Sequence, residues 1–173
     1  MGGLRQYAIP FKGLKDGKHD FNFVADNSFF EQFDSSEVKK GVVNVQVELI
    51  KHSHFLELQF DITGKVTVNC DRCLEPFVTG IDHQAMLYVR YGDKTHEQSE
   101  DLLILADTEN EIRLAQYIYE YIILALPYQR FHPEIDGISG CNPEMVDKLN
   151  AHQADESENA SEDPRWEKLK GLI

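Results

Sequence analysis

Residues 42–70 read VVNVQVELIKHSHFLELQFDITGKVTVNC, and apolar side chains stand at every second position along most of this stretch. Alternation with a period of two is typical of β-strands that bury one face. The polar run at residues 51–54 separates two such strands, so we expect a hairpin. In the second strand the apolar residues keep the same even positions before and after Gly64. This predicts one long strand that is bent at Gly64 by a bulge or a sharp curl. The alternating apolar residues are Val43, Val45, Val47 and Leu49 before the loop, and Leu56, Leu58, Phe60, Ile62, Val66, Val68 and Cys70 after it.

A third alternating run follows at residues 77–91, with its apolar side chains at odd positions. Three long neighbouring strands joined by short loops predict an antiparallel β-meander. Their length and the bend at Gly64 predict a strongly curled antiparallel sheet or a partial barrel. Residues 102–105 can add one more short strand.

The segment NEIRLAQYIYEYIILALP, residues 110–127, changes to apolar residues at helical spacing. We predict a main helix over residues 113–126, with Asn110 as its candidate cap. Pro127 ends the helix because proline cannot donate the helical hydrogen bond. This helix is expected to cover the open face of the sheet, which makes the fold class α+β. Its tyrosines are interpreted as core residues with hydroxyls at the rim, and a ligand pocket is the alternative.

Aromatic residues near the N-terminus predict two further elements. Phe21 and Phe23 alternate with polar residues, as in a short strand, and Phe29, Phe30 and Phe33 match one helical turn. Large aromatic side chains are usually buried, so we expect these five to latch onto the core. An exposed patch that binds a partner is the alternative.

The C-terminal part divides by composition. Asn142 followed by Pro143 is a typical helix start. Residues 155–163 hold five acids and no base, which is typical of a disordered linker. We therefore assign residues 1–153 to one domain, 154–163 to an acidic disordered linker and 164–173 to a C-terminal docking peptide with short helical character. The apolar stripe of that peptide, which either engages a partner or packs on the core, comprises Trp166, Leu169 and Leu172.

The charge of the chain limits its partners. Seventeen Lys and Arg stand against thirty Asp and Glu, which gives a net charge of −13. The electrostatic field of such a charge repels phosphate backbones and favours basic partners. The alternative is that the negative charge serves only to keep the protein soluble. Apolar runs such as residues 121–126 are too short to span a bilayer, and MGGLRQYAIPF lacks the apolar core of a signal peptide. We expect a cytoplasmic protein with no membrane partner.

Three cysteines supply the only metal-type spacing. Cys70 and Cys73 form a CDRC pair at the tip between two predicted strands, where both thiolates can reach one tetrahedral ion. Cys141 and His132 are the candidates to complete a structural zinc site. The alternative is that Cys70, in the buried phase of its strand, is a small hydrophobic residue. A thioredoxin-like role is disfavoured because that motif belongs at a strand-to-helix junction.

The sequence carries no other catalytic constellation. There is no GxSxG, HExxH, Walker loop or GxGxxG motif. We therefore do not expect an enzyme.

Three segments resemble the YceD family in order and spacing. They are KVTVNCDRCLEPF at 65–77, EYIILALP at 120–127 followed by a single cysteine, and DPRWEKLKGL at 163–172. The segment YAIPFKGLKDGKHDFNF at 7–23 is similar to the Bacteroidetes branch.

The resemblance implies a role in synthesis, processing or stability of the large-subunit ribosomal RNA, without enzymatic activity. The expected function is an accessory factor that binds a basic ribosomal protein or a ribosome assembly intermediate. Direct RNA binding through a local basic patch around Arg72 and Lys65 is the alternative. A zinc-dependent enzyme acting on RNA is disfavoured by the negative charge and by the lack of a visible general base.

Overall fold

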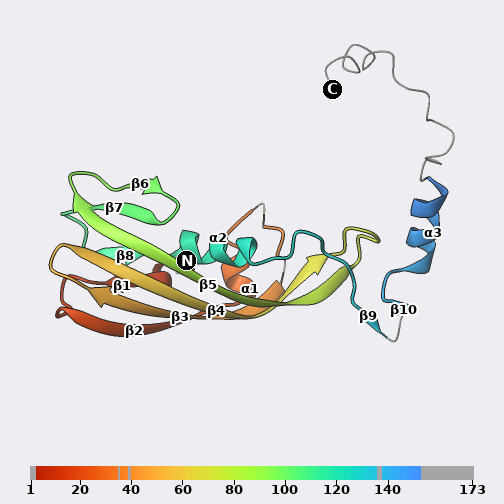
Figure 1. Ribbon diagram of the computed structural model, residues 1–173, viewed down its shortest axis with the longest axis horizontal. Helices are drawn as coiled ribbons and strands as arrows, with labels where there is room; N and C mark the ends of the chain where they lie inside the picture. The colour runs from red at the N-terminus through yellow and green to blue at the C-terminus, as the bar shows by residue number, and fades with distance from the viewer. Residues whose placement is uncertain (1–2, 35, 39, 136–137, 153–173) are drawn as a thin grey trace, which may run out of the picture.

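The computed structural model describes residues 3–34, 36–38, 40–135 and 138–152 (Figure 1). Its main element is a six-stranded sheet in the order β2-β3-β4-β5-β7-β6, which is open and is not closed into a barrel. The strands are β2 (Gly17–Ala25), β3 (Lys40–Lys51), β4 (Phe55–Asn69), β5 (Pro76–Gly92), β6 (His96–Ser99) and β7 (Leu102–Ala106).

The predicted meander is present. Strands β2 to β5 pair antiparallel in chain order. The short strand expected at residues 102–105 is β7, but it pairs parallel with β5 while β6 pairs antiparallel along its other edge. The sheet is therefore mixed. After β5 the chain first forms β6 at the outer edge, and it then returns as β7 between β5 and β6.

Gly64 shapes the sheet by close approach of a neighbouring strand. The pairing of β4 runs without a register shift from β3 on one side to β5 on the other, so the expected bulge at Gly64 is not formed. A Cβ at this position would stand 2.4 Å from the Val42 carbonyl oxygen and 2.6 Å from the Val43 Cα. Only glycine allows β3 and β4 to come this close.

The N-terminal phenylalanines pack on the core, as predicted. Helix α1 (Asn27–Phe30) begins after Asp26, whose carboxylate accepts the backbone N–H groups of Ser28 at 2.9 Å and Phe29 at 3.2 Å. Phe29 and Phe30 are buried. The other three lie partly buried against the same core, so the interpretation as an exposed patch is wrong.

The main helix is shorter than predicted at both ends. Helix α2 (Ala115–Leu124) begins after Leu114, without a side-chain cap. Asn110 does not cap it, because the residues that follow form β8 (Glu111–Arg113) and pair with β1 (Ala8–Pro10), next to the 3₁₀ turn η1 (Arg5–Tyr7). The distant partner β1 decides this outcome, since helix propensity is a weak preference that tertiary pairing overrides.

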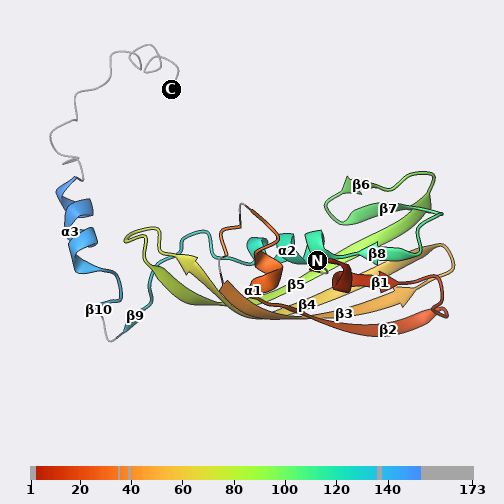
Figure 2. The ribbon, with the colours of Figure 1, turned by 180° about the vertical axis from the view of Figure 1, so that it is seen from behind.

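The core lies between the inner face of the sheet and the elements above it. Figures 1 and 2 show α1, α2 and the β1–β8 pair on the same side of β2 to β5. Tyr121 of α2 is buried, and its ring lies 5.1 Å from that of Phe60 in an edge-on arrangement. The tyrosine hydroxyl lies within 3.5 Å of the Met86 carbonyl oxygen, to which it donates. The core-packing interpretation of this tyrosine is therefore confirmed.

The chain after α2 leaves the main core and runs to the β4–β5 tip (Figure 1). It forms the short strands β9 (Glu134–Ile135) and β10 (Ile138–Ser139), then α3 (Pro143–Ala151). The Asn142 side chain accepts the backbone N–H of Glu144 at 3.0 Å, so the predicted cap is confirmed. The predicted linker at 154–163 and the docking peptide at 164–173, with Trp166, Leu169 and Leu172, lie outside the described residues. No helix among the described residues is long and apolar enough to cross a membrane.

Candidate metal centre

The first half of the candidate site is the turn between β4 and β5. The backbone N–H of Cys70 donates to the Glu75 carbonyl oxygen, and the N–H of Leu74 donates to the Cys70 carbonyl oxygen, each at 2.9 Å. Leu74 has φ 62°, in the left-handed region where glycine is the ordinary residue. These bonds close a narrow turn that holds Cys70 and Cys73 on one side of the tip, both buried.

The second half comes from the segment that follows α2. The backbone N–H of Asp71 donates to the Arg130 carbonyl oxygen at 2.8 Å, and the N–H of Arg130 donates to the Asp71 carboxylate at 2.7 Å. The Arg130 guanidinium also forms ion pairs with Glu37 and Asp71. This clamp brings His132, two residues further on, against the tip.

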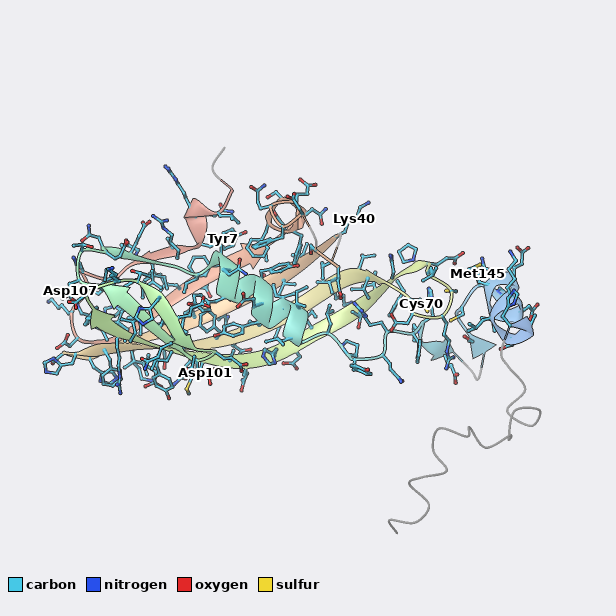
Figure 3. All side chains as sticks on the ribbon, turned by 90° about the horizontal axis from the view of Figure 1, so that it is seen from above. Tyr7, Lys40, Cys70, Asp101, Asp107 and Met145 are labelled. Atoms are coloured by element: carbon cyan, nitrogen blue, oxygen red, sulfur yellow. The ribbon has the colours of Figure 1, made fainter. Side chains whose placement is uncertain are left out.

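Cys141 arrives from the residue before the α3 cap. The Asn142 side-chain amide donates to the Glu75 carboxylate at 2.7 Å and ties the start of α3 to the tip. Met145 and Val146 of α3 pack on the cysteines. Figure 3 shows Cys70 and the labelled Met145 at the same end of the molecule.

The four side chains converge as a tetrad of three cysteines and one histidine. Their ligand atoms all lie within 4.8 Å of one another. The Cys70 and Cys141 Sγ atoms are 3.7 Å apart, and the Cys73 Sγ is 3.4 Å from His132 Nδ1. Tetrahedral zinc with bond lengths of about 2.3 Å to sulfur and 2.0 Å to nitrogen places ligand atoms about 3.5–3.8 Å apart. The two short separations match that geometry, so the cluster could hold a metal ion such as zinc.

The electrostatics of the tetrad favour one thiolate at neutral pH. Burial acts to raise the pKa of Cys70, but the surrounding N–H groups, with Cys73 and Arg72 foremost, lower it to about 6. The Arg72 N–H lies 3.4 Å from the Cys70 Sγ. The pKa of Cys141 is raised: the Ser139 hydroxyl acts to lower it, but burial and the neighbouring Cys70 sulfur outweigh that contact. A metal ion would replace the proton that Cys141 retains, so binding would release protons.

Packing and ligation are compatible at this site. All three cysteines are free and buried, and Phe77 and Phe131 enclose them together with the α3 residues. The hydrophobic interpretation of Cys70 therefore describes its surroundings correctly. It does not account for the histidine, whose ring nitrogen points at the Cys73 sulfur.

The two basic residues predicted from the sequence to bind RNA are not ligands of the tetrad: Arg72 lies between its two CxxC cysteines, whereas Lys65 lies outside the turn on β4. Arg72 is exposed, with its guanidinium 4.2 Å above the Phe131 ring. Lys65 is exposed on β4, in register with Val42 and Gly80 of the neighbouring strands.

The clamp between Asp71 and Arg130 was not predicted from the sequence. Its partners are 59 residues apart, and Arg130 stands in no motif that the sequence analysis identified. The only signal in the sequence is the position of Asp71 inside the CxxC pair.

Fold and site together define a β-rich protein in which a cluster of metal-ligand type joins a strand hairpin to a C-terminal segment. The chain belongs to the YceD family: residues 58–173 match the family model described as "Large ribosomal RNA subunit accumulation protein YceD". The match begins within β4 and includes the whole tetrad, so β1 to β3 and α1 precede it. No curated protein and no solved structure matches the chain. The family description points to accumulation of the large ribosomal RNA subunit and names no catalytic activity.

Proposed function

We propose that this protein is a non-enzymatic accessory factor that supports large ribosomal RNA subunit accumulation by binding a basic ribosomal component, and that its tetrad holds a structural zinc ion. The observation that carries the zinc proposal is the convergence of four protein ligand atoms within 4.8 Å. Four protein ligands fill a tetrahedral ion and leave no position for a reactive water. The ion would therefore stabilise the fold and would not act on substrate.

The position of the tetrad indicates what zinc would stabilise. Among the described residues, the C-terminal segment is joined to the tip by polar contacts such as the Asp71–Arg130 pair and the Asn142–Glu75 bond, and by packing around the cysteines themselves. A metal bound only in the folded state adds its binding free energy to that connection. Zinc would thus fix α3 relative to the sheet.

The charge of the chain supports a basic partner. At −13, the protein repels the phosphates that dominate RNA affinity and attracts Lys- and Arg-rich surfaces. Proteins of the ribosome that contact RNA are of this basic kind. The proposal therefore links the protein to ribosomal RNA through a protein intermediary.

Direct RNA contact is the second candidate, because the tip carries an exposed arginine. Arg72 stacks on Phe131, and an aromatic ring beside a guanidinium is a surface on which an unpaired base can stack. Lys65 lies on β4, before the turn that carries Arg72. The strongly negative total charge weighs against this candidate.

A pull-down separates the two. Tagged full-length protein is captured from native lysate with and without RNase, and large-subunit ribosomal proteins are quantified against an unrelated bait of equal negative charge. We expect specific enrichment of one or a few basic ribosomal proteins that survives RNase. Enrichment that disappears with RNase, together with submicromolar binding of purified protein to RNA, would support the direct RNA model and reject ours.

A further inference from the structure

A cleft with acidic walls lies along the sheet, well away from the tetrad. It has a volume of about 610 Å³ and is formed by the β6–β7 turn on one side and α2 on the other. Figure 1 shows β6 and β7 beside α2, far along the sheet from α3, and Figure 3 labels Asp101 far from Cys70. The acidic cleft is defined here by Glu97, Glu100, Asp101 and Glu120 over an aromatic and aliphatic floor.

The carboxylates of the acidic cleft have no cationic partner among the described residues. All four are exposed, and none takes part in an ion pair of that part of the chain. The described lining contains no Lys, Arg or His. Glu120 accepts a hydrogen bond from the Gln116 side chain at 2.7 Å, which leaves its charge uncompensated. A concave wall with one sign of charge focuses the field on what enters it.

The floor of the acidic cleft consists of tyrosine rings and aliphatic side chains, one of which is an exposed leucine. Tyr117, Tyr119 and Tyr121 line the cleft, with Ile123 and Leu124 at its edge. Tyr119 stacks on Phe33 with ring centroids 4.0 Å apart, so its ring is held in place before any partner arrives. Leu124 is 72% exposed, which is unusual for a leucine that has a buried core beside it.

The tyrosine hydroxyls stay neutral in this setting. Burial, followed by nearby carboxylates, raises the pKa of Tyr121 to about 12. Burial, followed by a hydrogen bond with Glu97, also raises the pKa of Tyr117. The rings are therefore uncharged acceptors for cationic groups at physiological pH.

We propose that the acidic cleft binds a Lys- and Arg-rich segment of a partner protein that also carries an apolar side chain. This inference rests on the proposed function and adds where the basic partner docks. Long cationic side chains lay their methylene stems and guanidinium planes on tyrosine rings while their charged ends reach carboxylates. The apolar side chain of the partner covers Leu124. A nucleic acid is disfavoured here because its phosphates would face four carboxylates.

The outer face of the sheet is the competing acidic surface. Its hollow, of about 680 Å³, is bordered by Asp20, Glu48 and Asp61 together with side-chain amides. Glu48 there is already paired with Lys18 at 2.9 Å. The described lining of this hollow includes no tyrosine, and the outer face offers a matched control for charge.

The test compares two triple variants with the same change in charge. The cleft variant is Glu97→Gln, Glu100→Gln and Glu120→Gln, and the control is Asp20→Asn, Asp61→Asn and Asp82→Asn on the outer face; all six residues are exposed. The probe is a short fluorescent peptide of alternating arginine and leucine, titrated by anisotropy at near-physiological salt. We expect the cleft variant to weaken binding by about tenfold and the control by less than about twofold. Equal losses in both would mean binding by net charge alone and would overturn the proposal.

A second pair of variants tests the apolar contact. Leu124→Ser is expected to weaken peptide binding several-fold, whereas Leu149→Ser on α3 leaves it unchanged. Loss of affinity with Leu149→Ser but not with Leu124→Ser would overturn the placement.

The native partner distinguishes failure of this inference from failure of the proposed function. If wild-type protein captures ribosomal proteins and the cleft variant captures them equally well, the cleft inference is wrong while the proposed function stands. If wild-type protein captures none, the proposed function fails first.

Discussion

Asp71 and Arg130 exchange two hydrogen bonds across 59 residues of sequence: each backbone N–H donates to the other residue, at 2.8 Å to the Arg130 carbonyl oxygen and 2.7 Å to the Asp71 carboxylate. The carboxylate also faces the Arg130 guanidinium, with the Arg130 Nε 3.8 Å from the Asp71 Oδ1. One aspartate within the CxxC tip thus positions the segment that delivers His132.

Replacing Asp71 therefore tests how the tetrad is assembled. Asp71→Ala removes the acceptor for the Arg130 N–H, and we expect zinc affinity to fall by about 10–100-fold, as for other outer-shell partners. The measurement is a chelator competition titration. Asp71→Asn keeps an acceptor oxygen and should retain most of the affinity. Unchanged affinity in the alanine variant would mean that the histidine is positioned without the clamp.

Metal content and stability should change together. Protein purified without chelator is expected to contain about one zinc per chain, and removal of the metal should lower the melting temperature. Cys141→Ser should lower both metal content and melting temperature, and chelator should then have no further effect. Zinc well below one per chain, with a stable Cys141→Ser variant, would show that the cysteines are packing residues.

The pKa of Cys70 predicts how the stability of the metal-free protein depends on pH. The N–H groups that lower this pKa to about 6, from an ordinary value of 9.0, surround the thiol only in the folded chain. Between these values the unfolded chain binds more protons than the folded one, so stability rises with pH. This contribution is fully present above pH 9 and is lost as the pH falls through 6.

Melting temperatures of the reduced, chelator-treated protein from pH 6 to 8.5 measure this effect. Other groups titrate in the same range, so the readout is the difference in slope between wild type and Cys70→Ala. We expect the wild-type slope to be the steeper by a few degrees across the range. A variant with an identical slope would contradict the assignment of the thiolate to Cys70.

Two glycines in the central strands, Gly64 and Gly80, should differ sharply in how well they tolerate substitution by alanine. Gly64→Ala places a Cβ against the backbone of β3, and we expect it to cost about 1–3 kcal/mol of unfolding free energy or to prevent folding. Gly80→Ala is the control, because a Cβ there meets nothing within 4 Å. Denaturant titration compares the two. Equal effects would show that the strands do not approach as closely as described.

The strands illustrate what could be predicted from the sequence alone. The alternation of Val43, Val45 and Val47 with polar residues is a local property, since successive side chains in a strand point to opposite faces. The same pattern specified the hairpin tip at Cys70 and Cys73. The amino-acid composition limited the ligand candidates, because the chain holds only one cysteine besides the CxxC pair.

Pairing between distant segments decided the rest. The residues after Asn110 extend as β8 because β1 offers them backbone partners, and β7 runs parallel to β5 because β6 occupies the far edge. No local pattern encodes either choice, since hydrogen bonds between strands depend on which segments meet in space.

Residue order thus specified the long strands β3, β4 and β5, their buried faces and the identity of the four candidate ligands. Tertiary structure alone decided that His132 and Cys141 meet the CxxC pair, and that four carboxylates surround the tyrosines of α2. The physical reason is distance along the chain. Periodicity reports on neighbours a few residues apart, whereas both sites are built from side chains on separate elements whose approach depends on packing of the whole core.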